Sequence, residues 1–210
     1  MKELLTHHKK LRACRECPNM CGTPVHGETT PSKILLIGQA PGPHEADRGK
    51  PFAYTAGKTL FKWLNEATDL EEEELRSLIY FAAVARCFPG KHPSGQGDRE
   101  PNKNEIENCR KYLEREVELL KPDIIIPVGK LAIREVLALP KSFSLEDVIG
   151  KRFYQTYHGH PSVFIPLPHP SGISRWHKIA PGKNLLEEAL ALLRKELGLK
   201  LVRKFARVTG

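Results

Sequence analysis

The chain has 210 residues and a formal net charge of +8, and 40% of its residues are hydrophobic while 28% are charged. This composition is typical of a globular protein, and no apolar run is long enough to span a membrane. The positive net charge favours a polyanionic partner. The alternative is a protein that is rich in lysine without having such a partner. Residues 1–8 hold too few apolar side chains for a signal peptide, so we expect a cytoplasmic protein.

Helical and strand patterns alternate without a long linker, which predicts a single domain over residues 1–210. A Cys-rich, irregular lead-in over residues 8–30 precedes the patterned part, and a basic tail over residues 200–210, expected as an edge strand or an arm, follows it. Asn104 is expected to begin a helix, with Glu107 completing a cap-like pattern. The order predicts a parallel sheet with helices on both faces. The expected strands are 33–37, 79–85, 123–128, 154–157 and 163–167, the helices are 56–67, 104–120, 130–138 and 184–197, and a polar loop spans 89–99.

Two loops that follow apolar strands predict a divided site. Residues 35–37 lead into Gly38-Gln39-Ala40-Pro41-Gly42, and residues 163–167 lead into His169-Pro170-Ser171-Gly172. In an open α/β sheet, loops after strand ends line the ligand crevice. One loop would therefore supply backbone N–H groups and the other an imidazole.

The five cysteines, an odd number, argue against a disulfide framework. Cys14 and Cys17 form a C-x-x-C pair, Cys21 follows closely, and Cys87 and Cys109 lie far downstream. A C-x-x-C pair alone fits a redox site, half of a zinc site or part of an iron–sulfur site.

Six motifs in chain order resemble the uracil-DNA glycosylase superfamily, most closely its iron–sulfur families 4 and 5. Residues 38–45, GQAPGPHE, are similar to the family 4 pattern G-E-x-P-G-x-x-E, and residues 49–57 resemble G-R-P-F-V-G-x-A-G. Residues 86–89 resemble K-C-R-P, residues 105–113 resemble E-I-x-x-C-x-x-x-L, residues 121–129 resemble R-P-x-x-I-x-x-L-G, and His169-Pro170-Ser171 matches the second catalytic motif. The resemblance covers about residues 10–195. It implies an α/β fold, a three-layer α/β/α sandwich around a central parallel four-stranded sheet.

The same resemblance implies a [4Fe-4S] cluster, for which four thiolates are the required ligands. Cys14, Cys17, Cys87 and Cys109 would hold it in a structural role. Cys21 is the spare cysteine and could replace one of them. Zinc is the alternative metal, because four-cysteine sites also bind zinc.

A glycosylase extrudes its nucleotide, reads the base and cleaves the C1′–N bond. By the resemblance, His169 would donate a hydrogen bond to the leaving base as a neutral imidazole, and Phe52 would stack on the base. Backbone N–H groups would contact the base from Gly38, Gln39, Ala40 and Gly42.

The chain departs from the family patterns at the residues that hold water and read uracil. Ala40 stands where the most familiar uracil enzymes carry Asp, and Gln39 stands where family 4 carries Glu; Gln can hold water but cannot act as a base. Ala83 occupies the position of the family 4 base-reading Asn. Glu45 is the best remaining candidate for positioning water, and Asp47 is a weaker substitute.

The loop after the second motif resembles the minor-groove wedge of the superfamily. Ile173 would fill the gap left by the extruded base, and Arg175, His177 and Lys178 could contact phosphates. The remaining expected DNA-binding residues are Ser171, Gly172 and Ser174.

We therefore expect a monofunctional DNA glycosylase that hydrolytically excises a deaminated base, uracil first, in base-excision repair. No lysine stands at a motif position that would suggest a Schiff base. The expected partner is DNA containing a deaminated base, and the expected protein is a prokaryotic, cytoplasmic, nucleoid-associated monomer. The alternatives are removal of another base, such as hypoxanthine, and a non-catalytic iron–sulfur protein that binds nucleic acid.

Overall fold

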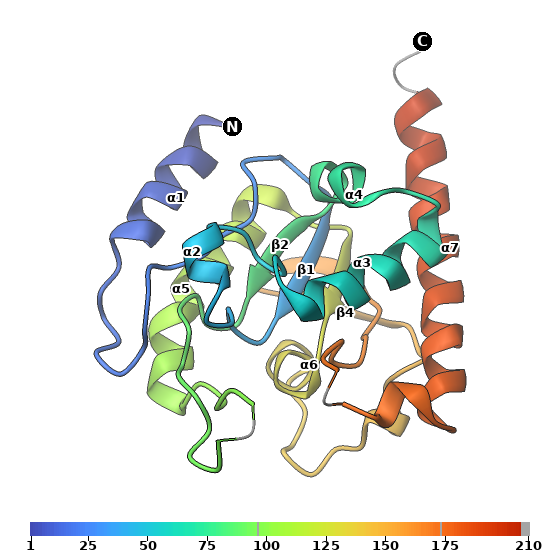
Figure 1. Cartoon of the computed structure of the whole chain (residues 1–210). Coiled ribbons are helices and arrows are strands. Elements are labelled where there is room, and N and C mark those ends of the chain that lie inside the picture. Colours follow the sequence, from blue (N-terminus) through green and yellow to red (C-terminus); the bar gives the residue numbers. More distant parts are fainter. Residues whose placement is uncertain (96, 173, 207–210) are drawn as a thin grey trace.

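The computed structural model describes residues 1–95, 97–172 and 174–206, which form layers of helices around a central sheet (Figure 1). The strands are β1 Ile34–Gly38, β2 Tyr80–Ala83, β3 Ile124–Pro127, β4 Phe153–Tyr157 and β5 His160–Phe164. The helices are α1 Lys2–Ala13, α2 Glu45–Arg48, α3 Thr55–Thr68, α4 Glu72–Leu78, α5 Lys103–Leu120, α6 Lys130–Leu137 and α7 Gly182–Ala206, with 3-10 turns η1 Leu145–Asp147 and η2 Trp176–Lys178.

The sheet has the strand order β2-β1-β3-β5-β4. Leu36 of β1 is paired with Phe81 of β2 on one side and with Ile126 of β3 on the other, and both pairings are parallel. The strands β2, β1, β3 and β5 form the expected parallel set, but the prediction of four strands is wrong, because β4 adds an antiparallel fifth strand beside β5. A short connection forces this direction, since parallel neighbours need a long crossover.

A tight turn joins β4 to β5 and shifts the strand that was expected at 163–167. His158 and Gly159 both have positive φ, 45° and 78°, as the favoured two-residue hairpin turns require. Strand β5 therefore begins at His160. The apolar residues beyond it still run beside β3, because the Ile165 N–H donates to the Ile125 carbonyl at 3.1 Å and Leu167 bridges Val128.

Helices cover both faces of the sheet, as the sequence predicts. Helix α3 packs against α7, and α1 packs against α5 on the other side of the sheet (Figure 1). Every residue of β1, β2 and β3 is buried, which is why these strands read as continuous apolar runs rather than alternating ones. Strands β1 and β5 run in the same direction as β3, so the predicted loops at 38–42 and 169–172, which follow them, reach the same edge of the sheet.

Three short or polar helices lie where the sequence predicts none. Helix α1 occupies the start of the lead-in, which is therefore not irregular throughout; its buried stripe holds Leu4, His7, His8 and Leu11, and the histidines hide the apolar period. Helix α2 is a single turn, and α4 is stabilised by a capping box between Glu71 and Glu74.

Two predicted helix ends are also corrected. Helix α5 is capped by Asn102, whose side chain accepts the Glu105 N–H at 3.0 Å, so the capping pair lies two residues before Asn104 and Glu107. Helix α7 continues through Gly198 to Ala206, so the predicted edge strand or arm is a helix up to that residue; residues 207–210 lie outside the described part. None of the described helices combines the length and apolar character needed to cross a bilayer.

A buried polar network connects α1, β2 and α5. Glu116 is fully buried and pairs with Arg86 through both carboxylate oxygens. The same carboxylate accepts the Tyr80 hydroxyl at 2.8 Å and lies 3.3 Å from His7 Nε2. His8 Nε2 lies 2.8 Å from the Tyr80 oxygen. The Arg86 and Glu116 charges compensate one another, which a buried ion requires.

This network predicts loss of stability in acid. Burial and the nearby His26 lower the pKa of His8 from 6.5 to about 3. As the pH falls, the unfolded chain therefore binds a proton at His8 before the folded chain does. The free energy of unfolding consequently falls as the pH falls from 6.5 towards 3. Burial raises the pKa of Glu116, but Arg86 and His7 outweigh it and hold the pKa at about 2, which extends the loss from pH 4.5 downwards.

Urea denaturation at a series of pH values measures this dependence. The His8→Asn variant, which cannot titrate at this position, should show a shallower decline than the wild type between pH 6.5 and 4.5. His92→Asn, at an exposed histidine, serves as the control and should follow the wild type. Equal slopes in wild type and His8→Asn would contradict the prediction.

Candidate active site

A cavity of about 510 Å³ opens at the carboxyl ends of β1 and β2. Its wall is built by the loop after β1, the turn before α3, the end of β2, the loop at 91–98 and the loop at 169–172. The two halves of the divided site, far apart in sequence, therefore meet in one cavity. The predicted site residues on its wall are Gly38, Ala40, Gly42, Glu45, Phe52, Ala83, His169, Ser171 and Gly172.

Gln39 is absent from the residues that line this cavity. Its carbonyl accepts the Ala85 N–H at 3.0 Å, which continues the β1–β2 pairing beyond the strand ends. The catalytic and base-binding roles of Gln39 stay predictions, because Gln39 does not line the cavity. Asp47 lies exposed on α2, also away from the cavity lining.

Close approach of backbone to an aromatic ring explains Gly38. A Cβ at Gly38 would lie 2.8 Å from Cζ of Phe52, so any larger residue would displace the ring. Phe52 itself has a φ of 54°, a left-handed conformation that costs a non-glycine residue about 1–3 kcal/mol. Gly57 packs so tightly on Phe52 that a Cβ there would overlap the Phe52 carbonyl oxygen at 1.7 Å.

Arg76 stabilises the strained backbone at Phe52. Its guanidinium donates to the carbonyls of Pro51 and Phe52 at 3.1 and 3.4 Å, and it lies 4.5 Å from the centre of the Phe61 ring. The side chain is only 7% exposed, and Glu72 balances its charge. The ring of Phe52 is therefore placed by contacts that sequence reasoning did not anticipate.

Glu45 lies at the start of α2 and is buried at the cavity wall. The Gly42 N–H donates to its carboxylate at 2.9 Å, so this N–H is engaged within the loop rather than free for a base. Burial raises the pKa of Glu45, while backbone hydrogen bonds from Gly42, Ala53 and Phe52 oppose the shift. The carboxylate thus braces the loop after β1 against the Phe52 segment.

His169 is fixed in a defined tautomer. The Ser171 N–H donates to Nδ1 at 3.2 Å, so in the neutral ring the proton resides on Nε2. Burial lowers the pKa of His169, against an opposing contribution from Asp98, and this keeps the ring neutral at neutral pH. Gly129 leaves room for the ring, since a Cβ there would lie 3.0 Å from its Cδ2.

Two charged residues of the cavity wall were missed by sequence reasoning. Lys91 and Asp98 form a bridge across the 89–99 loop, and the Lys91 Nζ lies 2.8 Å from Asp98 Oδ1. The only sequence signal was the unusual length of this polar loop, which indicates function or mobility without naming a residue.

The predicted DNA-contacting residues divide into two groups. Ser171 and Gly172 line the cavity, whereas Arg175 and Lys178 lie exposed beyond it. Ser174 donates its N–H to the Ser171 carbonyl at 3.2 Å, and Ile173 lies outside the described residues. His177, expected as a phosphate contact, is instead buried with its ring 5.0 Å from that of Trp63.

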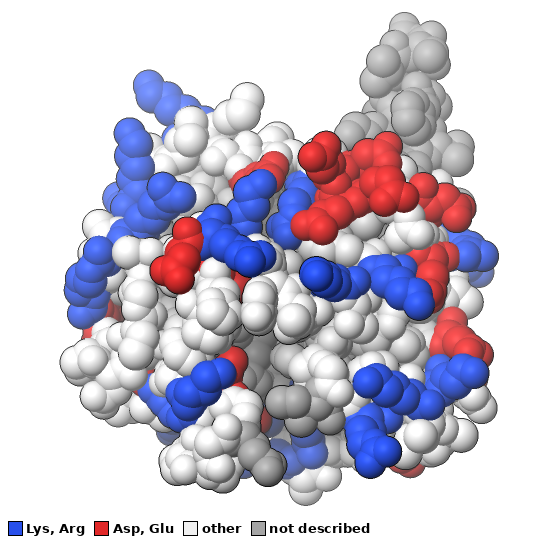
Figure 2. Space-filling model, viewed as in Figure 1, with Lys and Arg blue, Asp and Glu red and all other residues white. Residues whose placement is uncertain are grey.

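Charge on this side of the molecule is unevenly distributed. Figure 2 shows the acidic side chains gathered around α4, whose sequence includes Glu72, Glu73 and Glu74, while Lys and Arg follow the flank of α1 and the lower part of the face. The largest acidic cluster thus lies at one corner of this face, and smaller acidic groups lie among the basic ones elsewhere on it (Figure 2).

Four of the five cysteines lie close enough to influence one another. Burial raises the pKa of Cys87 to about 12, and Cys109, Cys14 and Cys17 add to the shift. Asn108 Nδ2 lies 3.5 Å from Cys17 Sγ. In the described part of the chain, no three Cys, His, Asp or Glu residues are arranged tightly enough for a single metal ion.

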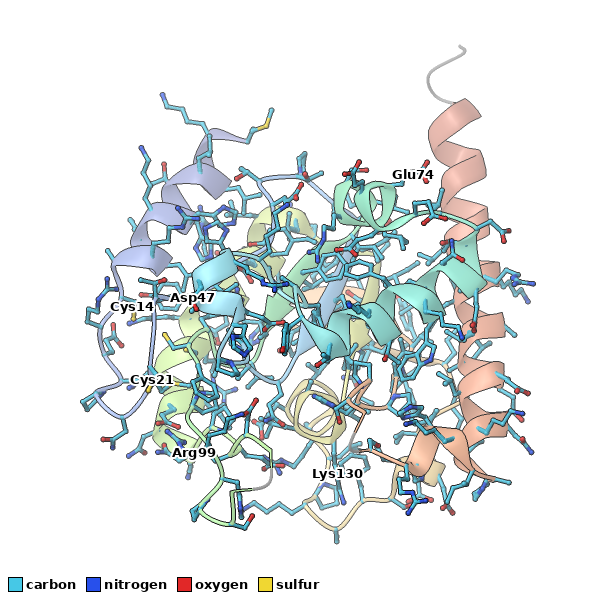
Figure 3. All side chains as sticks on the ribbon, viewed as in Figure 1. Cys14, Cys21, Asp47, Glu74, Arg99 and Lys130 are labelled. Carbon is cyan, nitrogen blue, oxygen red and sulfur yellow. The ribbon has the colours of Figure 1, made fainter. Side chains whose placement is uncertain are left out.

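Cys21 differs from the other cysteines. It pairs antiparallel with Phe88, through N–H to carbonyl distances of 2.7 and 3.1 Å. Cys109, Cys14 and Cys17 are the cysteines that raise the pKa of Cys87, and Cys21 is not among them. Cys21 is exposed, and it lies beside Arg99 on the same flank as Cys14 (Figure 3).

Comparison with known proteins supports the resemblance seen in the motifs. A family model described as the uracil DNA glycosylase superfamily matches residues 24–194. A type-4 uracil-DNA glycosylase of Saccharolobus solfataricus is 30% identical over 167 residues, which are 77% of this chain and 73% of the relative. A type-4 enzyme of Sulfurisphaera tokodaii is 28% identical over 76% of this chain and 70% of its own. A type-5 uracil-DNA glycosylase of Pyrobaculum aerophilum is 28% identical over 62% of each chain.

The contacts of Arg76 predict a stability effect. Arg76→Met leaves the Pro51 and Phe52 carbonyls without their donor, and we expect a loss of about 1–3 kcal/mol in the free energy of unfolding. Arg110→Met removes only an exposed pair with Glu107 and is the matched control, for which at most about 1 kcal/mol is expected. Urea denaturation compares the two, and equal losses would contradict the role assigned to Arg76.

Proposed function

The chain belongs to the uracil-DNA glycosylase superfamily, and we propose that it is a monofunctional DNA glycosylase that hydrolytically removes a deaminated base, uracil first, in base-excision repair. One observation carries the proposal. The Ser171 N–H occupies Nδ1 of His169, which leaves the Nε2 proton as a donor on a ring that lines the cavity. The type-4 relatives, matched over most of their length, support uracil as the base.

The reaction needs a donor at the leaving base. As the C1′–N bond breaks, positive charge develops on the sugar and negative charge on the base. The Nε2 proton of a neutral imidazole can bind a base oxygen as that charge grows, which is the kind of electrostatic stabilisation that lowers such barriers most. The burial that lowers the pKa of His169 also prevents the ring from entering the reaction already charged.

Phe52 is suited to hold an extruded base. Its ring edge is fixed by Gly38, and its backbone by Gly57 and Arg76, so the aromatic face is positioned before any ligand arrives. Stacking of a base on an aromatic side chain contributes about 1–3 kcal/mol and tolerates any base. Phe52 thus contributes to the affinity for any extruded base, and polar groups of the cavity must select among the bases.

Ala83 is the observation that favours a second candidate base. It lines the cavity with a methyl group where family 4 enzymes carry an Asn that reads uracil. Removal of hypoxanthine, or of another deaminated base, is therefore the alternative within the same chemistry. A non-catalytic iron–sulfur protein that binds nucleic acid is the alternative outside it.

We also propose that Cys14, Cys17, Cys87 and Cys109 hold a [4Fe-4S] cluster. The donor set fits, because Cys14 and Cys17 both raise the pKa of Cys87 and of Cys109, and a cationic cluster would relieve that repulsion between thiolates. Cys21 is not among the groups that raise the pKa of Cys87 or Cys109, and it stays the spare cysteine that could replace one of the four. The cluster would have a structural role, connecting the segment after α1 to the end of β2 and to α5, and zinc is the alternative metal.

The rest of the proposal concerns DNA itself. Arg175 and Lys178 are exposed beyond the cavity and are suited to phosphates. In a prokaryotic cell, DNA binding of this kind would place the protein on the nucleoid. A single cavity that takes one base needs only one chain, so we also propose a monomer.

Excision from labelled oligonucleotides tests the function. Duplexes and single strands carrying one uracil, hypoxanthine, xanthine or thymine are incubated and then treated with alkali, which breaks the strand at an abasic site. Breaks at uracil support the main proposal, and breaks only at another base support the alternative base. Tight binding without any break would favour the non-catalytic protein and overturn the proposed reaction.

His169 provides the sharpest variant in that assay. His169→Ala should reduce the single-turnover excision rate by about 10²-fold or more, as loss of an oxyanion donor does. His158→Asn, at the β4–β5 turn, removes an imidazole that does not line the cavity and should retain the wild-type rate. An unchanged rate in His169→Ala would refute its role at the leaving base.

Iron content tests the proposed cluster. Protein purified without oxygen should be brown, absorb broadly near 400 nm and contain about four iron atoms per chain. Cys109→Ser should lose iron and unfold at lower temperature, whereas Cys21→Ser should retain both iron and stability. Zinc in place of iron would support the alternative, and iron loss in Cys21→Ser alone would assign that ligand position to Cys21.

A further inference from the structure

At the motif positions, the cavity offers no carboxylate that is not already engaged by the protein's own backbone. Ala40 has no polar side chain, and Gln39 does not line the wall. Glu45 lines the wall, but its carboxylate already serves the Gly42 N–H and the backbone of the Phe52 segment. Attack of water on a sugar that gains positive charge still requires a group that holds the water and balances that charge.

Asp98 brings a carboxylate into the same cavity from a different part of the chain. A Cβ at Gly42 would lie 3.9 Å from Asp98 Oδ2, so this oxygen lies close to the loop after β1. The charge of Asp98 also reaches His169, whose pKa it raises against the effect of burial. The carboxylate thus lies within reach of both halves of the divided site.

The loop that carries Asp98 is anchored at its base. The Arg99 N–H donates to the Gly90 carbonyl at 3.0 Å, next to the bridge between Lys91 and Asp98. Arg99 then pairs with both oxygens of Glu105 at 2.7 Å and donates to the Asn19 carbonyl at 3.1 Å. Asp98 is therefore positioned by α5 and by the segment between Cys17 and Cys21.

Lys91 holds one oxygen of Asp98 and leaves the other available. Its Nζ contacts Oδ1 at 2.8 Å and lies 5.8 Å from the centre of the Phe88 ring. The Asp98 side chain is 33% exposed, so water reaches it. An ion pair that engages Oδ1 orients Oδ2 towards the loop after β1, where the substrate sugar would enter.

We propose that Asp98 is a catalytic carboxylate of this glycosylase, which positions the attacking water and accepts its proton; this rests on the proposed function. The water oxygen bonds to C1′ as the C1′–N bond breaks, and the bonding electron pair leaves with the base, whose oxygen is bound by the Nε2 proton of His169. One proton of the water passes to Asp98, which returns it to solvent, and the base anion takes a proton from solvent.

A pair of variants separates this role from a merely structural one. Asp98→Asn and Lys91→Met both remove the same ion pair, but only the first removes the carboxylate. Asp98→Asn should lower the single-turnover excision rate by about 10²-fold or more, the usual size of general-base catalysis. Lys91→Met should lower it only a few-fold, as loss of an exposed ion pair does.

Binding and stability provide the controls. Asp98→Asn should bind the same oligonucleotide at least as tightly as the wild type, because a negative charge near a polyanion has been removed. Asp69→Asn neutralises an exposed carboxylate at the end of α3, where a left-handed φ of 59° suits Asn, and should keep the wild-type rate.

The outcomes are distinguishable. Equal rate losses in Asp98→Asn and Lys91→Met would show that the pair only braces the loop, and a wild-type rate in Asp98→Asn would overturn the inference alone. If the wild-type protein excises no base, the proposed function fails and this inference fails with it.

Discussion

The buried pair between Arg86 and Glu116 is the interaction on which the remaining architecture depends. Glu116 projects from α5, Arg86 follows β2, and His7 of α1 contacts the same carboxylate. Each residue has a cysteine nearby in sequence: Cys14 after α1, Cys87 after Arg86, and Cys109 on α5. A buried charge that lost its partner would cost about 3–5 kcal/mol, so the three elements are fixed relative to one another before any metal is bound.

The cavity shows a second constraint, the close approach of backbone to backbone. Gly38 and Gly57 admit the ring and the carbonyl of Phe52, and Arg76 satisfies the carbonyls of a segment in a strained conformation. Strain of this kind persists only where the surroundings enforce it, and it is concentrated at functional sites. An aromatic surface that is fixed in advance binds a base without first paying to order the side chain.

The two catalytic proposals place opposite demands on the same cavity. His169 must remain neutral so that it can donate to a developing anion, and burial lowers its pKa accordingly. Asp98 must hold the attacking water, and its side chain contacts Lys91 through one oxygen and is partly exposed to solvent. The missing water-holding side chain at Ala40 would then be offset by a carboxylate from the loop at 91–98, which the Cys-containing segment helps to position through Arg99.

The sequence by itself determined the buried strands and the two loops of the divided site, because continuous apolar runs that end in glycine and proline are local signals. It did not reveal α1, since buried histidines interrupt the apolar stripe. It predicted a strand at 154–157 but not that this strand joins the sheet antiparallel to β5, since strand direction depends on the length of the turn. Only the tertiary structure decided that Asp98 faces Gly42, that Arg76 holds Phe52, and that Cys21 pairs with Phe88. These contacts join residues that lie far apart in the chain, and their geometry is set by packing and strand pairing, which no local pattern encodes.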